Sequence, residues 1–350
     1  MKVVIDDKVP YIAEAASRLF DQVVFLPGAR FGDSGELRDA DALIVRTRTR
    51  CDRSLLAGTS VKFVATATIG FDHINSADLR ELGIGWTNCP GCNASSVGQY
   101  IRNSLVLLSR SRGCRMDDLV VGVVGYGHVG REVCKALSQT GCRTVINDPP
   151  LRESGFGGVY FAELADLADQ CDVITFHTPL TRDGLHPTFH LADTPFFERL
   201  KRKPVIINAA RGGVVDERAM LQAYDAGLVS AMIVDTWENE PNISPRLLEQ
   251  AVIATPHIAG YSADGKSNAT RMSLRAVCQF FNINMGDEAE FLKLTAAPSL
   301  PSSLTPTGDT AEDWLRLYNP LEDSLRLKSA PDQFEWLRGN YPLRRESFGD

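Results

Sequence analysis

The sequence of 350 residues lacks the features that mark several classes of protein. It has no apolar run of 18 residues, the length that a membrane-spanning helix needs, and its N-terminus, MKVVIDDKVPY, lacks the apolar core of a signal peptide. Its net charge of −7 argues against general nucleic-acid binding, which depends on a basic face. We therefore expect a cytoplasmic protein that binds neither membranes nor nucleic acids.

Residues that bind metal ions are also sparse. The chain has only six histidines, and among its eight cysteines only Cys89 and Cys92 have a CxxC spacing. A structural metal site of this kind needs a second such pair or nearby histidines, and the sequence offers neither. We expect no metal site, and we interpret the cysteines as reduced thiols with structural or incidental roles.

What the chain does have is the composition of an ordinary globular protein. Hydrophobic residues make up 44% and charged residues 23%, and the length is enough for two or three domains with sizeable cores. Apolar β-prone runs alternate with helical patterns in two series, one from the first residue and one from about residue 119. Continuous apolar strands separated by helices are typical of buried parallel sheets. The predicted fold class is therefore α/β, with two doubly wound parallel-sheet domains of Rossmann or flavodoxin type.

The boundaries of these domains follow from two helices and a change of composition. Helical patterns at 99–111 and 263–281 link the two series, and the second could return the chain to the first domain. Residues 295–314 are rich in Pro, Ser and Thr, after which aromatic residues return. We predict a discontinuous first domain (1–98 with 261–285), a second domain (99–260) and a small C-terminal α+β module (286–350).

A glycine-rich turn with the pattern GxGxxG follows the strand LVVGVV and opens a helix. Its candidate cofactor-binding residues are Gly125, Gly127, His128, Val129 and Gly130. The glycines allow the backbone to approach a pyrophosphate, and the start of the helix favours its charge. The next strand ends in Asp148, where a carboxylate can bind both ribose hydroxyls. No arginine follows Asp148 immediately, so the pattern predicts NAD in preference to NADP.

Three chemically useful residues each follow a separate strand of the second series. Arg211 ends the strand in INAARGG and is followed by two glycines, acidic residues lie in IVDTWENEP after the next strand, and His257 lies in TPHIAG between Pro256 and Gly260. A histidine by itself is more often structural than catalytic. Here it lies on a held turn, and the carboxyl ends of parallel strands meet at one ligand-binding edge. This coincidence makes His257 a candidate acid/base with a carboxylate partner.

Taken in this order and spacing, GYGHVG, HTPL, INAARGGVVDE, DTWENEP and TPHIAGYS resemble the NAD-dependent D-2-hydroxyacid dehydrogenases. TATIGFDHIN, PGCNA and QFEWLRGNYPLRRE are similar to those members that oxidise a phosphorylated four-carbon hydroxy acid in vitamin B6 biosynthesis. The resemblance implies that His257 is the acid/base, Glu240 its partner and Arg211 the clamp for the substrate carboxylate. Further residues that it places against NAD are Asp148, Thr178, Ala209, Ala210, Asp235 and Gly260. Those that it places against the substrate are Thr47, Thr68 and Tyr261.

The same resemblance names the domains and leaves alternatives open. It implies that the first domain binds substrate, that the second binds NAD, and that residues 286–350 join two copies of the chain into a homodimer. The chain ends soon after Arg345, so part of this dimerisation module is expected to be missing or reduced. The alternatives are another enzyme of the family, such as one acting on 3-phosphoglycerate, or an NAD-sensing corepressor of the same fold.

The substrate phosphate requires cations that the net charge does not supply. The densest cationic stretch is IVRTRTRCDR, where a turn near Thr47 would bring Arg46 or Arg48 beside its hydroxyl. Arg50 and Arg53 are interpreted as a solvated edge. The pair at 344–345 is a second source of cations, which could reach the site of a partner in a dimer.

Overall fold

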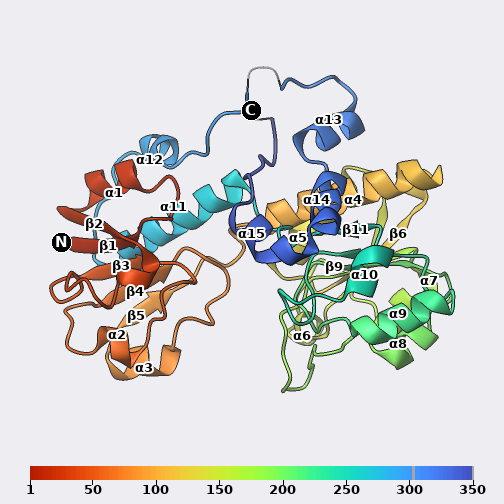
Figure 1. The fold of residues 1–350 in the computed structure, drawn as a ribbon, viewed down its shortest axis with the longest axis horizontal. Helices are drawn as coiled ribbons and strands as arrows, with labels where there is room; N and C mark the ends of the chain where they lie inside the picture. Colours follow the sequence, from red (N-terminus) through yellow and green to blue (C-terminus); the bar gives the residue numbers. More distant parts are fainter. Residues whose placement is uncertain (302–303, 349–350) are drawn as a thin grey trace. The chain divides into compact units, whose positions relative to one another are not determined.

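The computed structural model describes residues 1–301 and 304–348. The chain folds into two compact units, one of residues 1–93 and 262–300 and the other of residues 94–261 and 301–350. Each unit combines two separate stretches of the chain, as the colours of Figure 1 show.

The first unit contains a five-stranded parallel sheet with the strand order β2-β1-β3-β4-β5. Its strands are β1 (Lys2–Asp6), β2 (Gln22–Leu26), β3 (Ala42–Val45), β4 (Phe63–Thr66) and β5 (Gly85–Thr87). Every residue of β1, β3 and β4 is buried, which explains their continuous apolar sequences. The helices of this unit are α1 (Ala13–Leu19), η1 (Gly28–Arg30), α2 (Arg53–Leu56), α3 (Ser76–Glu81), α11 (Ala263–Phe280) and α12 (Glu288–Leu294).

The second unit contains a six-stranded parallel sheet with the order β11-β10-β9-β8-β6-β7. Its strands are β6 (Val120–Val124), β7 (Arg143–Asn147), β8 (Val173–Phe176), β9 (Val205–Asn208), β10 (Ala231–Val234) and β11 (Ile253–Ala254). The helices up to the last strand are α4 (Ala94–Arg112), η2 (Met116–Asp118), α5 (His128–Ser138), α6 (Pro149–Glu153), α7 (Leu164–Gln170), α8 (Thr194–Glu198), α9 (Glu217–Asp225) and α10 (Pro245–Gln250). Those near the C-terminus are α13 (Thr310–Leu317), α14 (Pro320–Ser329), η3 (Pro331–Gln333) and α15 (Phe334–Gly339).

These two sheets confirm the predicted α/β fold class. In each sheet the strand order reverses beside a strand that starts a βαβ unit, between β1 and β3 in one and between β6 and β8 in the other. Ligands of open parallel sheets bind at the carboxyl ends of the strands near such a reversal. In each unit, the edge of the sheet where the strands have their carboxyl ends is therefore the first place to look for ligand-binding residues. Among the described residues, no helix has the length and apolar character needed to cross a membrane.

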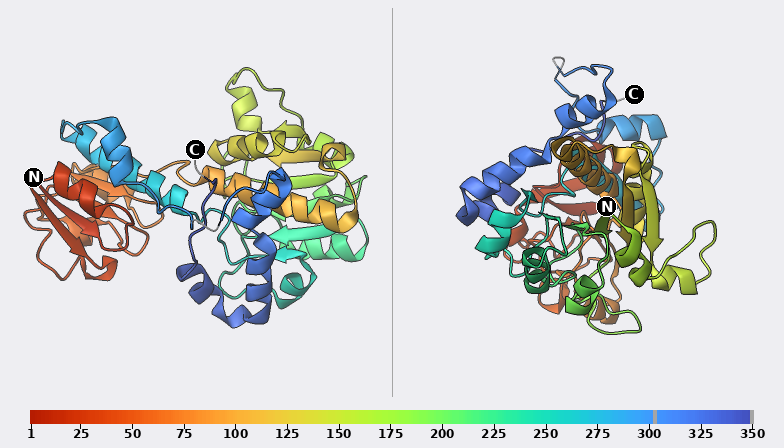
Figure 2. Two further views of the ribbon diagram at one scale, coloured as in Figure 1. Left: turned by 90° about the horizontal axis from the view of Figure 1, so that it is seen from above. Right: turned by 90° about the vertical axis from the view of Figure 1, so that its right-hand side faces the viewer.

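A separate C-terminal α+β module for residues 286–350 is not confirmed. Phe291 of α12 is buried in the core of the first unit, while Leu327 of α14 and Phe334 of α15 are buried in the core of the second. The left view of Figure 2 shows the dark blue C-terminal helices lying against the unit that holds the yellow-to-green strands. Because their apolar residues complete existing cores, these helices do not form a core of their own.

We predict that Leu327→Ala will lower the free energy of unfolding of the second unit by about 2–4 kcal/mol, because it leaves a cavity in the core. Leu327 is fully buried, whereas Leu325 of the same helix is 59% exposed. Leu325→Ala is therefore the matched control and should change stability little. Urea unfolding of both variants, with hydrogen exchange to locate the effect, provides the measurement. Equal effects of the two substitutions would show that α14 does not contribute to this core.

Candidate active site

The glycine turn between β6 and α5 brings three backbone segments close together. Gly125 has a φ of +91°, and a Cβ atom there would lie 2.9 Å from the carbonyl oxygen of His177. At Gly130, a Cβ atom would lie only 1.9 Å from the carbonyl oxygen of Gly125. The helix begins at His128 with Gly127 as its N-cap, which provides no side-chain cap. First-turn N–H groups of α5 can therefore face an anion such as a pyrophosphate.

Asp148 lies against this turn at the end of β7, as the sequence predicts. Its Oδ2 accepts a hydrogen bond from the backbone N–H of Tyr126 at 2.7 Å, and its Oδ1 accepts one from Leu151 at 3.0 Å. A carboxylate has about four acceptor positions, so these two bonds still leave room for ribose hydroxyls.

Two buried polar atoms beside the turn offer hydrogen bonds to a ligand. Thr178 Oγ1 and His177 Nδ1 have no hydrogen-bond partner among the described residues. The His177 Nε2 lies 2.9 Å from Thr175 Oγ1, and burial lowers the pKa of His177 to about 3, so the ring is neutral. Buried polar atoms are normally satisfied. The residues present therefore fit a dinucleotide with polar groups at this position.

The turn that carries His257 depends on Asp235, which ends β10. The carboxylate of Asp235 is fully buried and accepts hydrogen bonds from the N–H groups of Ile258 at 2.8 Å and Ala259 at 3.0 Å. It also accepts one from Thr255 Oγ1 at 2.6 Å, and burial raises its pKa above the ordinary value. His257 has a φ of +56°, a left-handed conformation that is uncommon outside glycine. The carboxylate thus holds a strained turn in place.

His257 and Glu240 form the central hydrogen-bonded pair of the candidate site. The Nδ1 of His257 lies 2.9 Å from Oε2 and 3.1 Å from Oε1 of Glu240. The Oε1 atom also accepts a hydrogen bond from the N–H of Trp237 at 2.9 Å. Burial favours the neutral form of Glu240, but the hydrogen bond and charge of His257 outweigh it, so the pKa of Glu240 lies below its ordinary value. With Nδ1 bound in this way, Nε2 is the nitrogen that can exchange a proton with a ligand.

Arg211 lies on the neighbouring loop, just after β9. Its side chain is exposed, and its Nη1 donates to the carbonyl oxygen of Ala210 at 2.7 Å. A Cβ atom on Gly212 would lie 1.8 Å from the carbonyl oxygen of Trp237. Only glycine allows this approach, which ties the loop of Arg211 to the loop of Glu240. Ala209 and Ala210 are buried at the same strand end, while Gly260 and Tyr261 are half-buried just after the His257 turn.

The remaining predicted residues belong to the first unit. Thr66 pairs with Val45 in the sheet, so Thr47 and Thr68 follow β3 and β4 at the same edge. Thr47 is exposed, whereas Thr68 Oγ1 donates to the carbonyl oxygen of Gly70 at 2.8 Å. Arg46 is half-buried and donates to the carbonyl oxygen of Lys8 at 3.1 Å.

The interpretation of Arg50 and Arg53 as a solvated edge is confirmed. Arg50 pairs with Asp52 and Arg53 with Glu81, and both arginines are more than half exposed.

Comparisons with known proteins identify relatives of this chain. The family described as "D-isomer specific 2-hydroxyacid dehydrogenase, NAD binding domain" matches residues 96–259. Erythronate-4-phosphate dehydrogenase of Bacteroides thetaiotaomicron is 51% identical over 347 residues, which cover 99% of this chain and 97% of that protein. The protein of the same name from Escherichia coli O127:H6 is 38% identical, covering 99% of this chain and 92% of that one.

The chain belongs to the erythronate-4-phosphate dehydrogenase family, within the D-isomer specific 2-hydroxyacid dehydrogenases. It is accordingly an oxidoreductase that uses NAD. Among solved structures, D-2-hydroxyisocaproate dehydrogenase has a TM-score of 0.68 at 20% identity, covering 80% of this chain and 97% of that chain. D-Lactate dehydrogenase of Aquifex aeolicus, complexed with NAD and lactic acid, has a TM-score of 0.60 at 22% identity, covering 82% of this chain and all of that one. These two likenesses show the shared fold.

Two arginines near the C-terminus of this family member contribute to the site in a way that the sequence did not reveal. Arg344 is not a surface cation that could reach a partner. It is buried, and its guanidinium donates to the carbonyl oxygens of Ile258, Ala259 and Tyr261, the segment that follows His257. Arg338 lies 3.5 Å from Glu240. Nothing in the local sequence pattern marks either residue, because both contacts join segments far apart in the chain.

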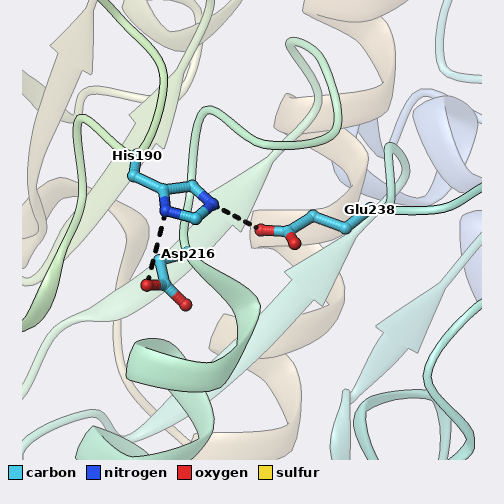
Figure 3. Close-up of side chains that lie close together, drawn as sticks. All are labelled: His190, Asp216 and Glu238. Carbon is cyan, nitrogen blue, oxygen red and sulfur yellow. Dashed lines mark hydrogen bonds and ion pairs between the residues drawn. The ribbon is translucent and has the colours of Figure 1, made fainter.

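A second histidine lies between two carboxylates close to the Glu240 loop (Figure 3). His190 Nε2 is 3.0 Å from Glu238 Oε1, and its Nδ1 is 3.5 Å from Asp216 Oδ2. The two carboxylates face different nitrogens of the ring, whose lone pairs diverge, so one metal ion could not be bound by all three residues through these contacts. Glu217 lies beside this cluster, and its Oε1 accepts a hydrogen bond from the N–H of Glu238 at 2.7 Å.

Glu217 gives a prediction for the pH dependence of stability. Burial raises the pKa of Glu217 to about 7 from an ordinary 4.5, and nearby carboxylates add to the effect. The folded state thus binds the proton more tightly than the unfolded state, and stability falls as the pH rises from about 4.5 through 7. In Glu217→Gln this loss should be absent, so the variant gains about 1–3 kcal/mol relative to the parent between pH 5 and pH 8.

Urea unfolding at both pH values measures this difference, and Glu322→Gln on the exposed surface of α14 is the control. If the free energies of unfolding of the parent and of Glu217→Gln differed by the same amount at pH 5 and at pH 8, the prediction would be contradicted.

Proposed function

We propose that this protein oxidises 4-phospho-D-erythronate at C2 to (R)-3-hydroxy-2-oxo-4-phosphooxybutanoate, with NAD as oxidant, in the synthesis of vitamin B6. The observation that carries the proposal is the ion pair between His257 and Glu240 at the strand ends of an NAD-binding domain. The name shared by relatives up to 51% identical over almost the full chain supports this choice of substrate.

The proposed chemistry follows from the geometry of the ion pair. The Nε2 of His257 accepts the proton of the C2 hydroxyl while the hydrogen on C2 leaves as hydride, so that the C–O bond becomes a carbonyl. Glu240 fixes the tautomer with the proton on Nδ1 and stabilises the imidazolium that forms. NAD, when bound, accepts the hydride.

Substrate orientation is assigned to Arg211, with further contacts from Tyr261, Thr47 and Thr68. A guanidinium can bind the substrate carboxylate through two parallel hydrogen bonds and polarise the neighbouring carbonyl as it forms. The exposed position of Arg211, beside the Glu240 loop, supports this role.

The contacts that individual residues make with NAD are also part of this proposal. The turn from Gly125 to Gly130 would hold the pyrophosphate, and Asp148 would bind the ribose and repel the additional phosphate of NADP. Thr178 would bind NAD through its hydroxyl, and the backbone of Ala209, Ala210 and Gly260 would line it. Contact between Asp235 and NAD stays a prediction, since both of its oxygens already accept hydrogen bonds from the protein.

The homodimer and the cytoplasmic location also stay predictions. All eight cysteines are free thiols, which agrees with a reducing compartment. Light scattering of the purified protein would measure its oligomeric state.

A substrate panel tests the proposed function. The purified protein is incubated with NAD or NADP and one of 4-phospho-D-erythronate, D-erythronate, 3-phospho-D-glycerate or D-lactate, and the reduced cofactor is measured by absorbance. We expect the highest kcat/KM with 4-phospho-D-erythronate and NAD. Preference for 3-phospho-D-glycerate would reassign the substrate, and binding of NAD without turnover of any hydroxy acid would refute the enzymatic proposal.

We predict that His257→Ala will lower kcat by about a hundredfold or more, the usual contribution of a positioned base, while the affinity for NAD stays nearly unchanged. Glu240→Gln should have a smaller effect and change the pH profile. His186→Ala is the control, because His186 pairs with Glu153 at an exposed position. Normal turnover by His257→Ala would exclude it as the base.

For the phosphate, we predict that Arg46→Ala will raise KM for 4-phospho-D-erythronate much more than KM for D-erythronate. The half-buried Arg46 follows β3 directly, where a cation would offset the substrate charge at short range. The control is Arg50→Ala, since Arg50 is 80% exposed and paired with Asp52. If both substrates are affected equally, Arg46 acts on the carboxylate or on folding instead.

A further inference from the structure

Arg338 is a third charged group at the His257–Glu240 pair. Its Nη1 lies 3.5 Å from Glu240 Oε2, and its side chain is 30% exposed, compared with 16% for Glu240. It reaches this position from α15, which is fixed by the buried ring of Phe334 and by the packing of Leu337 on the same core. The location of the guanidinium therefore follows from the packing of the C-terminal helices.

One carboxylate oxygen lies between the ring of His257 and the guanidinium of Arg338. Glu240 Oε2 lies 2.9 Å from Nδ1 of His257 on one side and 3.5 Å from the guanidinium of Arg338 on the other. A fixed positive charge favours the ionised form of Glu240 and disfavours a second positive charge on the ring. Arg338 thus stabilises the charge state in which His257 is neutral and can accept a proton.

We propose that Arg338 is a positioning residue for the oxidation: it holds Glu240 ionised and oriented toward His257. Its positive charge also opposes protonation of His257, so that the ring stays neutral to a lower pH than it would with Glu240 as its only charged neighbour. This inference rests on the proposed function, which assigns His257 as the base.

The other charged groups around the pair do not replace Arg338. Asp235 interacts with His257, but both of its carboxylate oxygens already accept hydrogen bonds from backbone N–H groups. Glu217 faces Glu240 from α9 and accepts a hydrogen bond from Glu238. Both are acids, so their charges act in the opposite sense to that of Arg338.

Arg338 itself faces two groups besides Glu240. It interacts with the hydroxyl of Tyr261, and Glu335 Oε1 lies 3.9 Å from its Nη1. Glu335 is half exposed, so solvent screens its charge. The more buried carboxylate, that of Glu240, is the one on which the charge of Arg338 acts most strongly.

The test uses the full chain with Arg338→Gln and Arg338→Lys, and measures kcat/KM from pH 5 to pH 9. Loss of the charge in Arg338→Gln should move the acid limb of the profile upward by about 0.5 to 1 pH unit. Arg338→Lys keeps the charge and should restore most of the limb. Arg246→Gln removes an equal charge from an exposed pair with Asp225, and its profile should match that of the parent protein.

A second measurement does not depend on turnover. The protein is labelled with ¹³C-histidine, the His257 signal is identified by its loss in His257→Asn, and its titration is followed by NMR. In Arg338→Gln the midpoint should move upward in the same direction as the acid limb. If neither the limb nor the midpoint moves, the proposal is wrong.

The outcomes also separate this inference from the proposed function. A rise in KM for 4-phospho-D-erythronate with an unchanged profile would make Arg338 a substrate-binding residue and overturn the positioning role. If the parent protein turned over no hydroxy acid, the proposed function would fail, while the NMR titration would still decide whether Arg338 acts on the pair.

Discussion

The buried carboxylate of Asp235 makes the interaction on which the arrangement of the candidate site depends. It accepts hydrogen bonds from the backbone on the far side of His257, and this holds a left-handed residue where most side chains would be unfavourable. Burying a carboxylate is costly unless it is hydrogen-bonded, and here three donors from one segment satisfy it. The direction of the imidazole ring is thereby set by the backbone before any ligand binds.

Parallel strands supply the second constraint. The loops after β9, β10 and β11 leave the sheet at one edge, and Gly212 allows the first of them to touch the backbone of the second. Arg211 and Glu240 are brought near one another by this contact. Around Glu240, the N–H of Trp237, the ring of His257 and the guanidinium of Arg338 come from three different segments. Removing any one of them would leave the carboxylate less well oriented.

Much of the fold could be predicted from the sequence, because its signals are local. Buried parallel strands appear as continuous apolar runs, and the glycine turn requires residues without a Cβ atom, as Gly125 and Gly130 show. The held turn of His257 could be expected from the proline and glycine that flank it. Each of these features leaves a signal in a short stretch of sequence, so the pattern alone was enough.

The contributions of Arg338 and Arg344 could not be predicted in this way. Arg344 contacts a carbonyl group 86 residues away, and a run such as PLRRE is equally compatible with a solvated end. The same limitation applies to the separate C-terminal module, which is not confirmed: the returning aromatic residues were visible in the sequence, but not the cores that they join. The role of Asp235 in holding the turn of His257 was also missed, since a carboxylate at a strand end can face either a ligand or the backbone.

The pairing of distant segments has a consequence for the order of synthesis. Cys89 in the first unit contacts the backbone of Ala269, 180 residues later, so the first unit stays incomplete until most of the second unit has been translated. The turn of His257 in turn waits for Arg344, near the end of the chain. Neither unit can therefore be completed before most of the other has been translated. A nascent chain stalled before α11 would present the apolar face of its first sheet to chaperones, and the turn of His257 is among the last parts that can be assembled.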